Sequence, residues 1–446
     1  MNTRRGFIKK AALGGAGIAV VNSAMAMPAS SYRRIVGAND RLNVAIAGLG
    51  RRYSAYKDAI VRKESNVQLV YLCDVMKSQR TDALGNFKKD LKYDIKLEND
   101  IRKVIDDKEV DILFNSTPDH WHTPGSIMAL KTGKNVYVEK PCSHDMNENE
   151  MLVAAAKKYN AIVQMGNQQR SSDHTIEVIN MIHDGKIGKP YKAVAFYENS
   201  RGEVPVQKKA PVPDGLDWDL FQGPAPHREY TYNTWDYNWH WYGWDFGTAE
   251  AGNNGTHELD VARWALQVDF PQHARVEAYK RAFKNDGWEM YDSMEATFNF
   301  PDEKIIQWDG KSRNGYDTYG AGRGTIIYGS EGAVFVNRSR YEMTDRSGKV
   351  IKERKAGSVE AGTALGGGGD TSTAHVVNFF NTIRGKEKLK APIADASISM
   401  AMVHYANIAY RTGKGFDIDD KTGKIYDRDA MRLWGRKYAD GWEPSI

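Results

Sequence analysis

The chain has 446 residues, too many for one ordinary hydrophobic core, so the length predicts two or three compact units. No apolar run is long enough to cross a bilayer, and the composition is that of a soluble globular protein. The formal net charge is +5, but without the four basic residues among the first ten, 58 basic residues face 57 acidic ones. This balance argues against nucleic acid or an anionic membrane surface as the main partner.

The first 26 residues predict an export signal. Thr3-Arg4-Arg5-Gly6-Phe7-Ile8-Lys9 precedes a weakly apolar Ala/Gly run, and Ala24-Met25-Ala26 is a small-residue cleavage site. The segment resembles a bacterial twin-arginine signal, and its glycines disfavour the alternative, an amphipathic N-terminal helix. The twin-arginine route carries folded proteins, so we expect a signal peptide at 1–26, a linker at 27–40 and a periplasmic protein that folds before export.

A dinucleotide-binding turn is predicted at the start of the next segment. The apolar run 43–47 leads into Gly48-Leu49-Gly50, where glycines let backbone N–H groups approach a pyrophosphate. Gly-x-Gly alone also occurs in ordinary turns, and Tyr53 replaces the third glycine of the fingerprint. A second apolar run, 67–74, ends in Asp74, which is placed to bind the ribose 2′-OH and so favours NAD over NADP.

Two alternatives stay open at this turn. Asp74 is also compatible with a helix N-cap or a solvated loop carboxylate. Arg51 and Arg52 could instead accept the 2′-phosphate of NADP, which leaves that cofactor as the less favoured choice.

Residues 118–141 predict a ligand-binding crevice. The apolar run VDILF ends in Phe114-Asn115-Ser116-Thr117-Pro118, and the next strand ends in Glu139-Lys140-Pro141. Open α/β sheets bind ligands at the carboxyl ends of their strands, where a lysine can carry out proton chemistry. We therefore assign Lys140 to catalysis and expect Thr117, Pro118, His122 and Glu139 beside the cofactor.

The strand and helix pattern changes after about residue 165. A Rossmann domain is predicted at 41–165, followed at 166–446 by an α+β domain with a mostly antiparallel sheet. Strands are expected at 191–197, 275–282, 293–300 and 304–308, joined by turns without regular helices. Helices are expected from Asp370 or Thr371 through Phe380 and from Ser397 to about Arg411.

An aromatic and polar stretch, 235–246, is followed by Asn253-Asn254-Gly255-Thr256-His257-Glu258-Leu259-Asp260. Aromatic faces with polar neighbours suit sugar rings, although most of these tryptophans are better explained as core. Thr256 or Asn254 can begin a helix whose first turn carries His257, with Asp260 on the same face. A lone histidine is more often structural than catalytic, but the lysine-bearing crevice favours a catalytic His257.

Together these motifs resemble those of the glucose–fructose oxidoreductase and inositol dehydrogenase (Gfo/Idh/MocA) family. Gly-x-Gly, Thr-Pro-x-x-x-His at 117–122, Glu-Lys-Pro at 139–141 and Gly-x-His-x-x-Asp at 255–260 occur in the family's order, and segments such as DWDLFQGPAP look like its exported, sugar-acting branch. The resemblance implies a Rossmann domain and a sheet domain that often forms a homo-oligomer interface. It implies that Lys140 polarises the substrate hydroxyl and His257 accepts its proton.

One departure from the family pattern concerns catalysis. The family commonly has an aspartate four residues before the histidine, where this chain has Asn253. Asparagine can orient a hydroxyl but cannot stabilise an imidazolium by charge, so the share of proton transfer between Lys140 and His257 is open.

The expected activity is reversible oxidation of a sugar or glycoside hydroxyl to a ketone by tightly bound NAD, with C3 of a glucoside as the specific case and no metal. Arg170, Tyr197, Trp239 and Asp260 are expected substrate contacts, although domain packing explains them equally well.

Two other functions remain possible from the sequence. A glycosidase of the NAD-dependent family 109 type has a similar fold and export route, but its members lack Glu-Lys-Pro. A non-catalytic sugar-binding protein is the more distant alternative.

Overall fold

The computed structural model describes residues 40–356 and 370–446, and residues Leu42–Ile446 form one compact unit. The predicted twin-arginine segment and almost all of the predicted linker lie outside the described residues. Within the described part of the chain, every helix is too short or too polar to cross a membrane.

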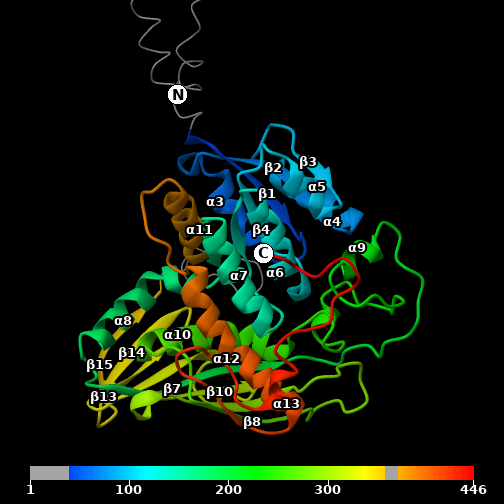
Figure 1. Cartoon of the computed structure of the whole chain (residues 1–446). Coiled ribbons are helices and arrows are strands. Elements are labelled where there is room, and N and C mark those ends of the chain that lie inside the picture. Colours follow the sequence, from blue (N-terminus) through cyan, green and yellow to red (C-terminus); the bar gives the residue numbers. More distant parts are fainter. Residues whose placement is uncertain (1–39, 357–369) are drawn as a thin grey trace, which may run out of the picture. The chain divides into compact units, whose positions relative to one another are not determined.

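The N-terminal part of this unit is a parallel sheet flanked by helices, as predicted (Figure 1). Its strand order is β3-β2-β1-β4-β5-β6, which places β1 in the middle. The strands are β1 (Leu42–Ala47), β2 (Val67–Cys73), β3 (Lys96–Glu98), β4 (Ile112–Asn115), β5 (Asn135–Val138) and β6 (Val163–Met165). The helices are α3 (Lys57–Val61), α4 (Lys77–Phe87), α5 (Ile101–Asp106), α6 (Asp119–Lys131) and α7 (Met146–Lys158).

This topology explains why the sequence motifs converge. β1 pairs in parallel with both β2 and β4, and β4 pairs with β5, so the four strands end at one edge of the sheet. The glycine turn, Asp74, Thr117 and Lys140 follow these four ends directly. The helix after the glycine turn is interrupted: residues Tyr53–Tyr56 form a 3₁₀ turn before α3, at the position where the fingerprint lacks its third glycine.

The second part is built on a large, mostly antiparallel sheet, which confirms the predicted fold class. Its order is β15-β14-β13-β12-β7-β10-β9-β8-β16, with β11 paired to β7, and only the β7–β10 pair is parallel. The strands are β7 (Pro190–Ser200), β8 (His273–Tyr279), β9 (Ser293–Asn299), β10 (Ile305–Lys311), β11 (Arg313–Asn314), β12 (Arg323–Gly329), β13 (Gly332–Val336), β14 (Arg340–Asp345), β15 (Val350–Lys355) and β16 (Phe416–Asp417). The four predicted strands correspond to β7, β8, β9 and β10.

The expectation that turns alone join these strands was wrong. Helix α8 (Asp173–His183) precedes the sheet, α9 (Trp218–Gln222) and α10 (Thr256–Leu266) lie between β7 and β8, α11 (Asp370–Ile383) and α12 (Ile393–Thr412) lie between β15 and β16, and α13 (Arg428–Met431) follows β16. Helix α8 buries Thr175, Val178, Ile179 and Ile182, a helical spacing that the strand reading overlooked. The predicted helices α11 and α12 are present.

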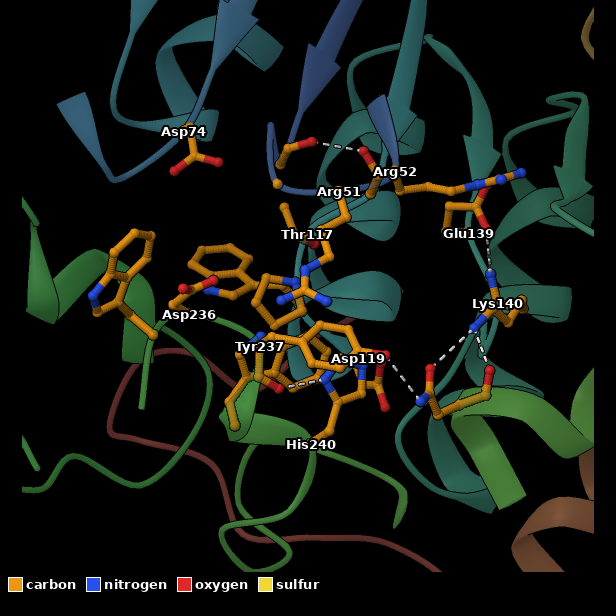
Figure 2. Close-up of a pocket in the computed structure, with 18 of the residues that line it drawn as sticks. Arg51, Arg52, Asp74, Thr117, Asp119, Glu139, Lys140, Asp236, Tyr237 and His240 are labelled. Atoms are coloured by element: carbon orange, nitrogen blue, oxygen red, sulfur yellow. Dashed lines mark hydrogen bonds and ion pairs between the residues drawn. The ribbon is translucent and has the colours of Figure 1, made fainter. Parts of the chain in front are cut away.

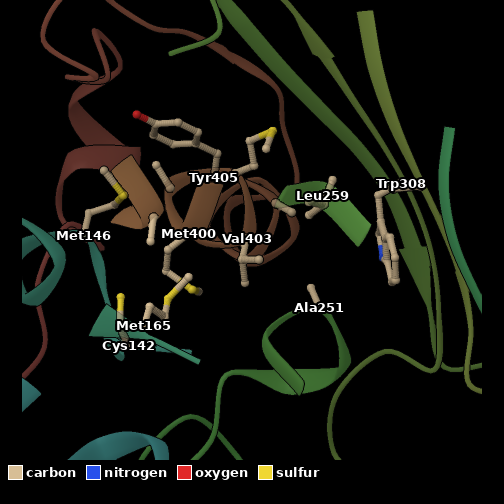
Figure 3. Close-up of a cluster of buried hydrophobic side chains, with 14 of the residues drawn as sticks. Cys142, Met146, Met165, Ala251, Leu259, Trp308, Met400, Val403 and Tyr405 are labelled. Atoms are coloured by element: carbon tan, nitrogen blue, oxygen red, sulfur yellow. The ribbon is translucent and has the colours of Figure 1, made fainter. Parts of the chain in front are cut away.

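Helix α12 organises the core between the two sheets. It packs against α7, α10 and β8, and Figure 3 shows Met400 and Val403 facing Met165 and Cys142 from the Rossmann side and Leu259 and Ala251 from the other. Cys73 and Cys142 are both buried free thiols.

Helix α11 completes the other side of the Rossmann core. Phe379 and Phe380 pack edge-to-face against Phe114 of β4. The C-terminal part of the chain therefore stabilises the strand that carries Thr117 and Pro118.

Candidate active site

A pocket of about 320 Å³ lies at the carboxyl edge of the parallel sheet. Figure 2 shows Asp74 at one end and Glu139 with Lys140 at the other, with Arg51, Thr117 and Tyr237 between them. Residues from β7, β12 and the segment before α10 close the opposite side, so the pocket has a Rossmann wall and a sheet wall. Most of the predicted site residues line it: Gly48, Gly50, Arg51, Arg52, Asp74, Thr117, Pro118, Glu139, Lys140, Tyr197, Trp239, Asn253 and His257.

The Rossmann wall fits a dinucleotide. Gly48 has φ +84°, and a Cβ there would lie 2.3 Å from the Ser116 carbonyl oxygen, so the turn requires glycine. A Cβ at Gly50 would meet no atom within 4 Å, which leaves open space for a pyrophosphate. The Asp74 carboxylate accepts hydrogen bonds from the backbone N–H groups of Leu49 (2.7 Å) and Met76 (2.8 Å), which hold it at the turn where a ribose would bind.

The arginines after the glycine turn are engaged elsewhere. Arg52 Nε donates to Glu139 Oε1 at 2.7 Å, and the Tyr56 hydroxyl donates to the same oxygen at 3.0 Å. Burial disfavours the charged form of Glu139, but Arg52 keeps its pKa below the usual value. The Arg51 guanidinium lies 4.1 Å from the Tyr237 ring centroid. The NADP alternative is weakened, because Arg52 is already paired with Glu139.

Lys140 is fixed by the segment that precedes α10. Its Nζ donates to the Asn253 carbonyl oxygen at 2.5 Å and lies 3.5 Å from Asn253 Oδ1 (Figure 2). The Asn253 amide in turn donates to the Tyr237 hydroxyl at 3.3 Å. Burial lowers the pKa of Lys140 to about 8, despite the opposing charges of Glu139 and Asp119. A lysine of this kind is close to the protonation balance that proton transfer near neutral pH requires.

His257 lies in the first turn of α10, as predicted, but Thr256 does not cap the helix. Residues Ala251–Gly255 form a π-helical turn that runs directly into α10. Among the described residues, the buried Nδ1 of His257 has no hydrogen-bond partner. Burial and the positive charges of Arg338 and Lys140 lower the pKa of His257 well below its ordinary value. The neutral ring is therefore favoured, and within residues 40–356 and 370–446 no carboxylate pairs with it to stabilise an imidazolium.

The structure places three predicted site residues away from the pocket. The side chain of His122 is buried in α6, and its Nδ1 lies 2.5 Å from the Pro141 carbonyl oxygen, so it supports the lysine loop from behind. Arg170 and Asp260 form a buried two-point ion pair, with N–O distances of 2.7 and 2.8 Å. Because each satisfies the other, their geometry is that of domain packing and not of substrate contact.

Some residues of the aromatic stretch 235–246 line the pocket, and others are buried in the hydrophobic core. Trp235, Tyr237, Trp239 and His240 line the pocket. Trp241 is instead buried and stacks on Trp288, with ring centroids 3.9 Å apart. Burial lowers the pKa of His240 well below its ordinary value, and its Nδ1 lies 2.7 Å from the Tyr237 carbonyl oxygen.

Four charged pocket residues lie outside both the predicted site residues and the aromatic stretch 235–246. Asp119 is buried at the start of α6 and accepts from the Thr248 hydroxyl at 2.6 Å. Arg201, Arg323 and Arg338 belong to the sheet wall. Asp119 stood inside the Thr-Pro-x-x-x-His motif and could have been found there, whereas the three arginines are far apart in the chain and share no motif.

Family comparison agrees with this geometry. Residues 42–167 match the Gfo/Idh/MocA model for an oxidoreductase family with an NAD-binding Rossmann fold, and residues 194–443 match that family's C-terminal α/β domain. The chain belongs to the Gfo/Idh/MocA oxidoreductase family, and its N-terminal domain is an NAD-binding Rossmann domain.

Individual relatives are distant. Inositol 2-dehydrogenase of Salmonella typhimurium is 26% identical over 150 residues, which are 33% of this chain and 44% of that protein. Alpha-N-acetylgalactosaminidase of Tannerella forsythia is 24% identical over 254 residues, 52% of this chain and 53% of that protein. The chain thus spans about half the length of these relatives. A levoglucosan dehydrogenase solved with NADH and levoglucosan superposes with a TM-score of 0.63 at 17% identity, covering 84% of this chain and 99% of the other, which shows a shared fold.

Proposed function

We propose that this protein is an NAD-dependent oxidoreductase that oxidises a ring hydroxyl of a sugar or glycoside, with C3 of a glucoside as the preferred position. The observation that carries the proposal is the placement of Lys140, Asn253 and His257 in the same pocket as the glycine turn and Asp74. Bound NAD supplies the acceptor for the hydride that leaves the substrate carbon with its electron pair.

Lys140 and the sheet wall then orient the substrate hydroxyl and accept its proton. As the C–H electrons leave, the O–H bond breaks, its electrons form the C=O bond, and a base must take the proton. His257 is a poor final acceptor, because cations flank it and no carboxylate supports it. Lys140, whose pKa is about 8, is the better acceptor, and His257 orients the hydroxyl. This assignment reverses the roles that the family resemblance implied.

The aromatic residues of the pocket support a sugar substrate. Trp239 and Tyr237 provide flat apolar surfaces beside polar groups, which suits the C–H faces and hydroxyls of a pyranose. A ketone at C3 acidifies the C2 proton and permits elimination of the C1 substituent. The product would therefore be consumed by a lyase-type cleavage of the glycosidic bond by another enzyme.

Export by the twin-arginine route is part of the proposal. An exported enzyme has no free nicotinamide pool, so a tightly bound cofactor would be reoxidised by a second carbonyl substrate or an external acceptor. Replacing Arg4→Lys together with Arg5→Lys should abolish periplasmic accumulation of the tagged protein. Unchanged export in that variant would remove this part of the proposal.

A second candidate is an NAD-dependent glycosidase, because the similar proteins include alpha-N-acetylgalactosaminidase of T. forsythia. The purified protein would be denatured before and after incubation with glucosides and N-acetylhexosaminides, and the released nucleotide and sugars identified by mass spectrometry. NADH together with a ketosugar supports the oxidoreductase. Free sugar released without net reduction of NAD supports the glycosidase.

A further inference from the structure

The sheet wall of the pocket carries three arginines, two of which have carboxylate partners. Arg201 Nε lies 3.5 Å from Glu250 Oε2. Arg323 binds both oxygens of Glu258, with Nε and Nη2 each at 2.9 Å. These two pairs are close to neutral.

Arg338 is the exception. Its guanidinium lines the pocket but makes no hydrogen bond or ion pair within the described parts of the chain, 40–356 and 370–446. Glu258, the carboxylate whose charge acts on Arg338, already has both oxygens engaged by Arg323. Burial and the charge of Arg323 lower the pKa of Arg338 to about 9, the response of a cation without a counter-ion. At neutral pH it is still charged.

The turn that presents Arg338 is held in place. Asn337 Oδ1 accepts hydrogen bonds from the backbone N–H and hydroxyl of Ser339, at 2.9 and 3.0 Å, and from the N–H of Arg340 at 3.0 Å. The Asn337 carbonyl lies 2.7 Å from His174 Nε2 of α8. Arg338 is thus carried by a turn between β13 and β14 whose backbone is held by hydrogen bonds, which reduces the entropy lost when its side chain binds an anion.

The position of Arg338 favours a substrate over the cofactor as the source of the anion. It belongs to the sheet wall, whereas Gly48, Gly50 and Asp74 belong to the Rossmann wall. Arg338 lines the same pocket as His257, and its positive charge contributes to the lowered pKa of that histidine. An anion bound there would neutralise Arg338 and make His257 a better proton acceptor.

We propose that Arg338, supported by the Arg323–Glu258 pair, is a subsite for an anionic substituent of the substrate, a carboxylate or a phosphate ester. Guanidinium groups bind both anions through two parallel N–H···O bonds. The inference rests on the proposed function for the sugar itself and deepens it: the natural substrate is a uronoside, another sugar acid or a sugar phosphate.

Calorimetric titration of the NADH-loaded protein tests the subsite. The probes are methyl β-glucuronide, methyl β-glucoside 6-phosphate and the matched neutral methyl β-glucoside. The wild-type protein should bind at least one anionic probe about tenfold to a hundredfold tighter than the neutral one, the range for hydrogen bonds to a charged group. Preference for the glucuronide identifies a carboxylate subsite, and preference for the 6-phosphate identifies a phosphate subsite.

Substitutions of Arg338 test whether this residue causes the preference for anionic over neutral probes. Arg338→Gln should remove it without changing the affinity for the neutral glucoside or NADH, and Arg338→Lys should retain part of it. The control is Arg346→Gln, whose side chain is 74% exposed on the turn after β14. Melting curves and NADH affinity establish that each variant is folded.

Three outcomes would overturn the subsite. These are equal binding of neutral and anionic probes by the wild type, an anionic preference that survives in Arg338→Gln, and a selective loss of NADH affinity in that variant. The proposed function fails separately: anion-dependent binding without hydride transfer would contradict the oxidoreductase and leave the subsite intact.

Discussion

The two walls of the pocket are built on different principles. On the Rossmann wall the functional residues directly follow the ends of β1, β2, β4 and β5, so short local motifs position them. On the sheet wall they come from the end of β7, from β12 and from the β13–β14 turn, and only the tertiary fold brings them together. Short sequence motifs therefore encode the cofactor side, whereas Arg201, Arg323 and Arg338 reach the sheet wall only through long-range contacts.

We expect the largest loss of activity from a substitution of Lys140, which lies where the two walls meet. Lys140→Met should lower kcat by about a thousandfold, the range for loss of a general base, while leaving NAD affinity nearly unchanged. The measurements are steady-state kinetics and nucleotide titration. Lys157→Met, on the exposed face of α7, is the matched control. Full activity in Lys140→Met would contradict the proposed chemistry.

The second prediction concerns packing between the walls. Asp260→Asn removes the two-point partner of the buried Arg170 and leaves it only the single contact with Asp395 at 3.1 Å, so the free energy of unfolding should fall by about 3 kcal/mol. Denaturant titration measures this loss. The KM of the folded variant for its substrate should be unchanged. A large rise in KM without a loss of stability would instead show that Asp260 contacts the substrate.

The third prediction sharpens the role of the Rossmann wall. Asp74→Asn removes the charge that repels a 2′-phosphate, so the preference for NAD over NADP should fall by about tenfold. Binding titrations with both nucleotides measure the ratio. An unchanged ratio would show that Asp74 only stabilises the turn, through its hydrogen bonds with Leu49 and Met76, and does not bind the ribose.

The smallest effect is a shift in pH dependence. Since Lys140 must be deprotonated to accept a proton, kcat/KM for oxidation should rise by about tenfold per pH unit and level off above its pKa of about 8. Asn253→Asp places a negative charge beside Lys140, so the midpoint should move up by about one pH unit. A profile that is already flat at neutral pH would identify His257 as the acceptor.

The Rossmann sheet and the cofactor side of the site could be predicted from the sequence. The order of apolar runs and the placement of Gly48, Asp74 and Lys140 predicted the Rossmann sheet and its edge, because each signal lies within a few residues of a strand. Helix α8 was missed although Thr175, Val178, Ile179 and Ile182 show its spacing.

The remaining differences have tertiary causes. His122 lies inside a matching motif, yet the helical rotation of α6 turns it toward the Pro141 carbonyl and away from the pocket. Arg170 and Asp260 are 90 residues apart and satisfy each other. The unpaired state of Arg338 depends on Arg323 engaging Glu258, which no single segment of the chain reveals.

The most direct test uses a glucoside that carries deuterium at C3. We predict that deuterium moves to the bound NAD and that NADH carrying this label accumulates in step with a 3-keto-glycoside, in the wild type but not in Lys140→Met. Release of free sugar that retains its deuterium, or the absence of label in the nucleotide, would contradict the proposed oxidoreductase.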